Sequence, residues 1–291
     1  MALLLMLAIA VDIGRLYVAR QYLINSCDAS ALAGGMELPN QAKATTQASK
    51  CAGANSMTTY QISFPTDGLS AGMDKIRVDG QLNVQYAFAG IIGQKSRTVS
   101  AYAIVSRTAG VSWAKQVVPW GMPYYDAKGV PYHYDNGVLY TLKMGSGDDH
   151  VGGNFQALAL GGTGGSVYRD NIASGYDGVL RVGDWISSET GNMVGPTGQG
   201  VDSRMQQASV PPWVDDTWNN HDYGNPRILI VPIISPLSNG RADVQIIGFA
   251  AFWLDSFKGQ EVKGYFLSYT IPDAGGSGPA DYGVSTFQLF E

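Results

Sequence analysis

The chain has 291 residues, a formal net charge of -5 and only 15% charged residues. Its length favours two folded units, and the lack of any basic run of five or more residues argues against nucleic-acid binding. Glycine at 37 positions and an aromatic content of 11% indicate a loop-rich, β-rich protein outside the cytoplasm.

The chain begins with a segment that predicts one long helix. No proline occurs between Ala2 and Gly34, and Gly14 is the only glycine inside this span. Apolar residues recur there at three- to four-residue spacing and form one face: Ile13, Leu16, Leu23 and Cys27. At 1.5 Å per residue such a helix is roughly 50 Å long, more than a globular domain needs.

The first third of this helix is apolar on all sides, but its uncharged run stops at Val11. That is about half of the roughly 20 residues that span a bilayer. A signal peptide fits poorly, because neither a positive leading segment nor a small-residue cleavage site accompanies the run. Two explanations remain: the membrane span began upstream of a processed or truncated chain, or the apolar end is buried against copies of itself.

Asp12 is the first charged residue after this run. An ionisable group inside an apolar helix is costly unless it is paired. Asp12 could pair with Arg15 one turn later, or with a cationic group such as the amino terminus of a neighbouring subunit. Alternatively, it marks only the boundary between membrane and water.

Residues 10–35, AVDIGRLYVARQYLINSCDASALAGG, resemble the N-terminal segment of TadG-like (TadE/G-like) proteins of the tight-adherence (Flp) pilus system. The matching positions are Asp12, Gly14, Arg15, Arg20, Asn25, Asp28, Ala29, Ala31, Leu32, Ala33 and Gly34. Cys27 departs from the small residue usual there, and the upstream half of the membrane segment is absent. The resemblance implies a pilin-like assembly helix that carries Asp12, Gly14, Arg15, Leu16, Arg20, Asn25 and Asp28.

The two cysteines, Cys27 and Cys51, are too few and too far apart for a zinc site. In an oxidising compartment one disulfide between them is expected, and it would attach the end of the helix to the following loop. Two free thiols are the alternative.

Residues 37–110 alternate apolar and polar positions as half-buried strands do. Asp79-Gly80 suggests a hairpin turn. Residues 86–105, YAFAGIIGQKSRTVSAYAIV, resemble the arrangement of strand, short apolar helix, glycine and strand in the same family. This segment is therefore expected to form a small antiparallel sheet that the long helix covers.

Residues 111–291 differ from the preceding segments in their sequence pattern. VVPWGMPYY marks a boundary, RILIVPII and ADVQIIGFAAFWLDSF predict strands, and VKGYFLSYTI is expected to be the last strand. The family resemblance continues here at Pro119, Gly121, Pro123, Gly153, Asn154, Phe155, Leu158, Leu160, Gly161, Gly162, Glu189, Gly191, Asn192, Gly195, Pro196, Thr197, Gly248 and Phe249. This resemblance implies that the chain is a member of the family, but it implies little about the chemistry of this region.

Motifs of catalysis are weak in this chain. His133, His150 and His221 have no metal-ligand spacing. The chain has no Gly-x-Ser-x-Gly, and neither GQKS nor GGTGGS satisfies a nucleotide-binding motif. We therefore expect a protein without enzymatic activity and without a cofactor.

Calcium is a weaker alternative, because acidic and amide side chains lie in Gly-rich stretches. The candidate ligands are Asp148, Asp149, Asn154 and Asp170, the last with Asn171 and Asp184 nearby. Their spacing does not match a known calcium loop, and polar turns closed by Asp and Asn side chains are the preferred explanation.

Two segments interleave aromatic and polar residues, which suits sugars or protein partners. Their candidate surface comprises Trp120, Tyr124, Tyr125, Tyr132, Tyr134, Trp213 and Trp218. The other interpretation is that these aromatics form the core of a loop-rich domain.

The sequence thus predicts an α+β protein with three segments. Residues 1–36 form a membrane and assembly helix, 37–110 a pilin-like β module, and 111–291 a β-rich outer domain. The expected role is a structural or minor pilin-like subunit of an extracellular Tad/Flp-type filament, anchored in the inner membrane before assembly. Its expected partners are copies of itself or other pilins, and the alternative is a surface adhesin that binds glycans or proteins.

Overall fold

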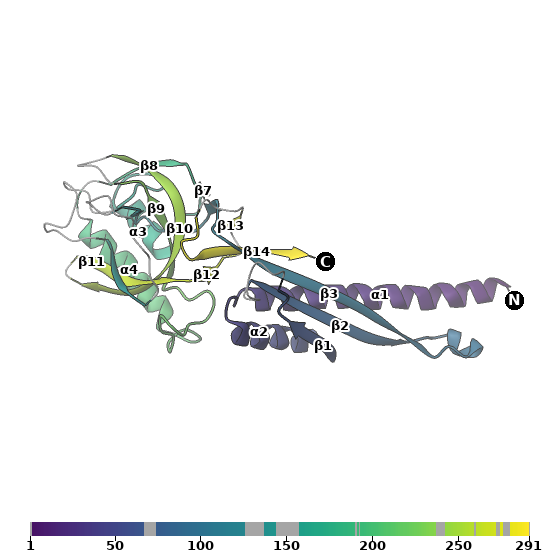
Figure 1. Ribbon diagram of the computed structural model, residues 1–291. Helices are drawn as coiled ribbons and strands as arrows, with labels where there is room; N and C mark the ends of the chain where they lie inside the picture. Colours follow the sequence, from purple (N-terminus) through teal and green to yellow (C-terminus); the bar gives the residue numbers. More distant parts are fainter. Residues whose placement is uncertain are drawn as a thin grey trace. The chain divides into compact units, whose positions relative to one another are not determined.

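The computed structural model describes residues 2–66, 74–125, 137–143, 157–189, 191, 193–236, 242–258, 260–271, 274–275 and 280–290. The protein is α+β, with a long N-terminal helix and a β-rich C-terminal region (Figure 1). It divides into two compact units, residues 1–108 with 287–291 (unit 1) and residues 109–286 (unit 2).

Two helices begin unit 1. Helix α1 runs from Ala2 to Gly35 and α2 from Gln41 to Ala54. Helix α1 ends at a glycine pair, as expected from the sequence. The second helix was not predicted. Asn40 caps it by accepting a hydrogen bond from the N–H of Lys43, and its alanines at every fourth position pack closely on α1.

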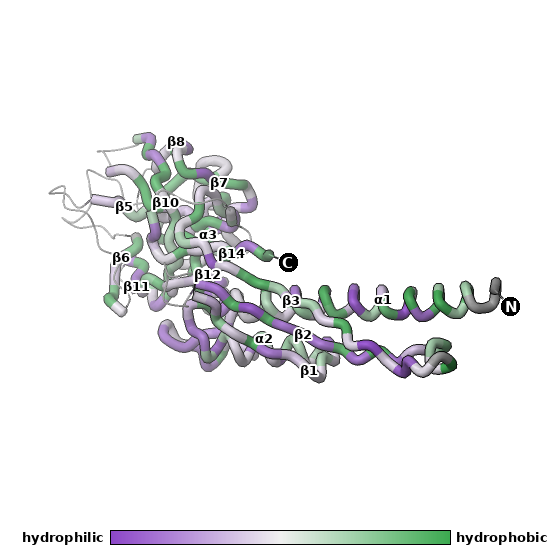
Figure 2. Tube along the Cα trace, turned by 45° about the vertical axis from the view of Figure 1, so that its right-hand side comes forward, coloured by the Kyte–Doolittle hydropathy of each residue, from purple (hydrophilic) through white to green (hydrophobic). Residues whose placement is uncertain are grey.

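An antiparallel sheet covers one side of α1 in unit 1. Its strands are β1 (Thr59–Ser63), β2 (Lys75–Gln85) and β3 (Ser96–Ala109), and the end of β14 (Val284–Phe290) continues it beside β3. Strands β2 and β3 lie along α1 in both views (Figures 1 and 2). The core between helices and sheet comprises Leu23, Cys27, Ala31, Leu38, Ala44, Ala48, Ala52, Met57, Ile76, Val78, Ala103 and Val105.

The predicted hairpin turn at Asp79-Gly80 is wrong, because both residues lie in the middle of β2. A Cβ atom at Gly80 would stand 2.8 Å from the Sγ of Cys27 and 2.9 Å from Leu23 Cδ1. Glycine is present here because α1 approaches the strand closely, and no turn is involved. The true turn between β2 and β3 contains the short helix η1 (Ala89–Ile92), followed by Gly93 with a φ of 87°.

Unit 2 is built on a curled antiparallel sheet. The strand order is β5 (Met122–Pro123), β9 (Ile228–Ile234), β10 (Asp243–Lys258), β11 (Glu261–Leu267) and β6 (Leu139–Lys143), and β8 (Trp185–Ser187) also pairs with β10. Strand β5 runs parallel to β9 and the other pairs are antiparallel. The 16-residue β10 contains two register shifts, which bend it.

Both faces of this sheet are buried, which explains the continuous apolar run in β10. Phe252 and Leu254 belong to one core cluster, and Phe249 and Trp253 belong to the other. Helices α3 (Gly165–Ser174) and α4 (Val194–Ala208) cover the first face. A small sheet of β4 (Trp113–Ala114), β7 (Leu180–Arg181) and β13 (Ala274–Gly275) contributes to the second.

The chain continues beyond the segment that was expected to be its last strand. VKGYFLSYTI forms β11 and the short β12 (Tyr269–Thr270), and β14 follows. Strand β14 pairs in parallel with β12 through Val284 and Ser285. Strand β14 was not predicted, because its alternating pattern, VSTFQLF, is short and follows a Gly-rich stretch.

Candidate functional site

Asp12 is held by the turn between β2 and β3. Its carboxylate accepts hydrogen bonds from the N–H groups of Ala87 (2.6 Å), Ala89 (2.8 Å) and Phe88 (3.1 Å). These N–H groups lie at the start of η1, where no side chain of the turn itself provides a cap. Asp12 therefore caps η1 from a helix 75 residues earlier in the chain, and we call this arrangement the Asp12 clamp.

The electrostatics of the clamp follow from these bonds. Burial alone would raise the pKa of the Asp12 carboxyl, but the hydrogen bonds from residues 87–89 and the charge of Arg15 outweigh it. The net result is a pKa below its ordinary value. Asp12 is only 5% exposed and remains charged because its own chain satisfies it. The hydrogen-bond partners of Asp12 are thus backbone N–H groups, and Arg15 acts on it only through its charge.

Helix α1 has two segments that differ in their burial. Its inner segment (residues 23–35) is packed in the core of unit 1, whereas its outer segment (residues 6–22) exposes most of its large apolar side chains. The exposed fraction is 69% for Met6, 60% for Ile13 and 66% for Val18. The full set of exposed apolar residues in the outer segment is Met6, Leu7, Ile9, Val11, Ile13, Tyr17, Val18 and Tyr22.

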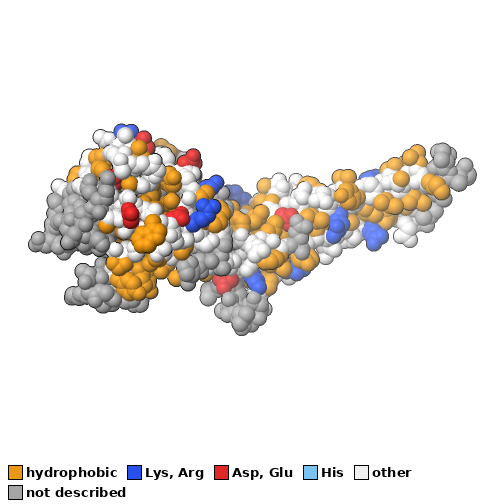
Figure 3. Space-filling model, turned by 90° about the horizontal axis from the view of Figure 1, so that it is seen from above, with side chains coloured by type: hydrophobic (Ala, Val, Ile, Leu, Met, Phe, Trp, Pro, Cys, Tyr) orange, Lys and Arg blue, Asp and Glu red, His pale blue; other side chains and the backbone are white. Residues whose placement is uncertain are grey.

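The turn at η1 adds to this apolar surface. Ile91 is 86% exposed and Phe88 is 43% exposed. An apolar pocket of about 440 Å³ lies between the turn and α1, and Ile9 and Leu16 contribute to its wall. Figure 3 shows hydrophobic side chains along this end of unit 1, with lysine and arginine beside them.

The other predicted residues of the helix lie around this surface. Gly14 is exposed, and a Cβ there would meet no atom within 4 Å. Arg15 and Arg20 are exposed, and Asp28 is partly buried. Asn25 accepts a hydrogen bond from Gln21 and is exposed. Among the described helices, none has a stretch long and apolar enough to cross a membrane.

The predicted disulfide is wrong, because Cys27 and Cys51 are both free thiols. The Sγ of Cys27 is buried and faces the sheet, 3.6 Å from the carbonyl oxygen of Ala101. Cys51 lies in α2, where Asn55 Nδ2 is 3.5 Å from its Sγ. Burial, with the nearby charges of Asp28 and Asp79, raises the pKa of the Cys27 thiol to about 11. Cys27 therefore acts as a small core residue.

The expected aromatic surface does not form as one patch. Trp120 is fully buried and donates a hydrogen bond to the hydroxyl of Tyr168 (2.6 Å). Tyr124 packs against the core and Tyr125 is 37% exposed. Tyr132 and Tyr134 lie outside the described residues.

The two remaining predicted aromatics have separate environments. Trp218 packs on the core and stacks on Tyr265 with ring centroids 4.9 Å apart. Trp213 lines a pocket of unit 2. This pocket, whose lining includes the buried Arg204, was missed by the sequence analysis because its residues are scattered from 115 to 271.

The calcium candidates are only partly described. Asp148, Asp149 and Asn154 lie outside the described residues. Asp170 forms an exposed ion pair with Arg169 at 2.8 Å. The side chains of Asn171 and Asp184 bond to backbone groups of Leu160 and Arg181, as in polar turns. The described part of the chain contains no group of three or more potential metal ligands.

Comparison with known proteins gives one result. Residues 1–37 match the family model described as Putative Flp pilus-assembly TadE/G-like. This match covers α1 and ends two residues after it. No curated protein and no solved structure matches the chain.

Proposed function

We propose that this protein is a non-enzymatic structural component of a Tad/Flp-type pilus system, assembled through the outer segment of α1. In this role it acts as a structural or minor pilin-like subunit. It is held at the inner membrane before assembly and displayed on the cell surface or in an extracellular filament afterwards. Its partners are copies of itself or other pilins.

The observation that carries this proposal is the exposed apolar surface of the outer segment. Leaving a large apolar side chain in water forfeits about 1.5–3 kcal/mol relative to burying it. Eight such side chains lie on one short stretch of helix, and the apolar turn at η1 extends the surface they form. So many exposed apolar side chains on one element are typical of a surface that contacts another apolar surface.

The backbone of the outer segment supports close helix packing. Ala10 and Gly14 are exposed one helical turn apart. Small residues at this spacing allow the backbones of two helices to approach closely. The Asp12 clamp supports the same role, because it removes the need for a charged partner at this depth of the helix and fixes the turn beside it.

The family match at residues 1–37 supports the same assignment, because it falls on the helix that carries the surface. In unit 1 Asp12 caps η1, and Arg77 forms an ion pair with Asp79 at 2.6 Å, so these charged groups have structural partners. A role in assembly needs no catalytic group.

The test is photo-cross-linking in assembled filaments. A benzophenone amino acid replaces Val18, which is 66% exposed in the outer segment. We expect cross-links to a pilin or to a second copy of this chain, identified by peptide mass. The matched control places the same probe at Tyr60 on β1, which is 37% exposed. Equal yields from positions 18 and 60, or no cross-link from position 18, would contradict the proposal.

A surface adhesin is the second candidate function. The observation that favours it is the aromatic-walled pocket of unit 2, which has no part in the assembly of α1.

A further inference from the structure

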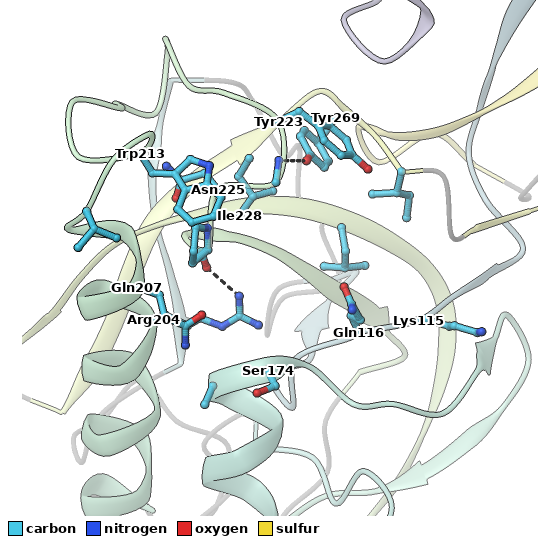
Figure 4. Close-up of a pocket in the computed structure, with 16 residues that line it drawn as sticks. Lys115, Gln116, Ser174, Arg204, Gln207, Trp213, Tyr223, Asn225, Ile228 and Tyr269 are labelled. Atoms are coloured by element: carbon cyan, nitrogen blue, oxygen red, sulfur yellow. Dashed lines mark hydrogen bonds between the residues drawn. The ribbon is translucent and has the colours of Figure 1, made fainter. Parts of the chain in front are cut away.

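Unit 2 contains a pocket of about 710 Å³. It lies among α3, α4, the loop after α4, β9 and β12 (Figure 4). This volume is in the range of small-molecule sites. None of the described residues that line it is acidic.

A buried cation lies in the pocket wall. Arg204 of α4 is only 7% exposed, and its Nε donates to the carbonyl oxygen of Ile172, near the end of α3. Its Nη1 donates to the carbonyl oxygen of Pro226 at 2.7 Å. Two backbone carbonyls therefore hold the guanidinium in place, and they account for only part of its five N–H donors.

The remaining end of this guanidinium has no partner among the residues that the structure describes. Among the described residues, no group accepts a hydrogen bond from Nη2, and no carboxylate forms an ion pair with Arg204. Figure 4 shows the guanidinium pointing toward the open middle of the pocket. Burial lowers the pKa of Arg204 to about 10, so the group is still charged at neutral pH. A buried charge without a counter-ion is costly unless a bound anion compensates it.

A second cation and an amide also line the pocket, and Figure 4 shows the side chain of Lys115 extending away from Arg204. Lys115 and Gln116 follow β4, and both side chains are exposed. Gln116 has a φ of 54°, a left-handed conformation that is unfavourable for a residue with a side chain. Such backbone is tolerated where the surrounding structure requires it, and it is enriched at ligand sites.

Aromatic rings form another wall. Tyr223 stacks on Tyr269 with centroids 5.4 Å apart and an interplanar angle of 10°. Trp213 also lines the pocket, and its Nε1 is buried without a hydrogen-bond partner in the described part of the chain. Its indole ring, and not its closed-off N–H group, is the part of Trp213 that a pocket ligand can contact.

We propose that this pocket binds a carboxylated sugar residue. The carboxylate accepts from Arg204 Nη2 and is attracted by Lys115. The apolar face of the sugar ring packs on the aromatic wall. A simple anion would use the cations but not the rings, and a neutral sugar would leave the charge of Arg204 uncompensated.

The test uses calorimetric titration of the full chain with D-galacturonate, D-galactose, acetate and hippurate. We expect galacturonate to bind about tenfold more tightly than galactose, the effect of one hydrogen bond to a charged group. Acetate should bind more weakly than galacturonate, because it lacks the ring. If galactose or acetate bound with the same affinity as galacturonate, the proposal would be overturned. It would also be overturned if hippurate were the only compound to bind, because that result would indicate a carboxylate-terminated peptide as the ligand.

Variants that leave the fold intact separate the contribution of the positive charge from that of the aromatic ring. Lys115→Gln should weaken galacturonate about two- to fivefold and leave galactose unchanged, as expected for an exposed charge. Trp213→Leu should weaken both sugars about fivefold or more, since a ring contact is lost. The matched controls, Lys258→Gln and the 66% exposed Trp185→Leu, lie outside the pocket lining and should bind as the parent does. Parent-like affinity in both pocket variants would overturn the proposal. The pocket lies within unit 2, so this result is independent of filament assembly.

Discussion

The inner and outer segments of α1 are equally helical but differ in what their apolar side chains contact. In the inner segment Leu23, Cys27 and Ala31 are buried against the sheet of unit 1. In the outer segment Ile13 and Val18 face outward, and the main tertiary hydrogen bonds are those of the Asp12 clamp. The difference teaches that hydrophobicity alone does not identify a core. The inner segment should determine stability, and the outer segment should determine assembly.

The largest expected effect is in the inner segment. Leu23 is 2% exposed, so Leu23→Ala should lower the free energy of unfolding by about 2–5 kcal/mol through lost burial and a residual cavity. Urea unfolding measures it. The control Val18→Ala, on the exposed side of the same helix, should stay within about 0.5 kcal/mol of the parent. Similar losses in the two variants would remove the distinction between the segments.

Replacing a glycine by alanine in each segment of α1 tests the same difference between the buried inner segment and the exposed outer segment. A Cβ at Gly34 would stand 2.4 Å from Ile76 Cδ1 and 2.9 Å from the backbone oxygen of Ala44. Gly34→Ala should therefore cost about 1–3 kcal/mol of unfolding free energy by overpacking. Gly14→Ala has open space and should gain up to about 1 kcal/mol from better helix propensity. Thermal unfolding of both variants measures the difference, and a loss at Gly14 would contradict it.

The Asp12 clamp is expected to act locally. Asp12→Asn keeps the shape of the side chain but removes the charge that three N–H groups bind. The amides of Ala87, Phe88 and Ala89 should then exchange with solvent faster, while those of the inner segment stay protected. Amide exchange measured by NMR reports both. Unchanged protection at residues 87–89 would show that the clamp contributes little in solution.

Acid should mimic this substitution. The pKa of Asp12 is lowered in the folded state, so its stabilising contribution is fully present above the unfolded-state pKa of about 3.9. It is lost as the pH falls through the lower folded-state pKa. We expect the amides of residues 87–89 to lose protection in this acidic range in the parent protein, with no corresponding step in Asp12→Asn.

The smallest effect concerns the thiols. Cys27 is buried with a pKa of about 11, so it is almost entirely protonated at neutral pH and inaccessible. Iodoacetamide should modify Cys51 first and reach Cys27 only when unit 1 unfolds. Two thiols should be counted in the denatured, unreduced protein. A count of zero would restore the disulfide expected from the sequence.

The sequence predicted the elements whose signals are local. The absence of proline up to Gly34 indicated the long helix. The predicted order of a strand, a short helix, a glycine and a second strand also agrees with the structure, where β2 is followed by η1, Gly93 and β3. Asp79-Gly80 was misread because a glycine that admits a neighbouring helix looks the same in sequence as a turn glycine. The partners of Asp12 could not be predicted, because backbone N–H groups 75 residues away have no side-chain signature. Arg204 was missed for a similar reason, since its two known acceptors are backbone carbonyls.

The most direct test of the central claim is the double variant Ile13→Ser and Val18→Ser, measured for both unfolding and filament yield. Both side chains are at least 60% exposed, so the melting temperature should match that of the parent. Filament yield should fall sharply, because two contacts of the outer segment are lost. The control Val210→Ser and Val214→Ser, two exposed valines of unit 2, should assemble normally. A stable double variant of the outer segment that forms filaments at the parent yield would contradict the account.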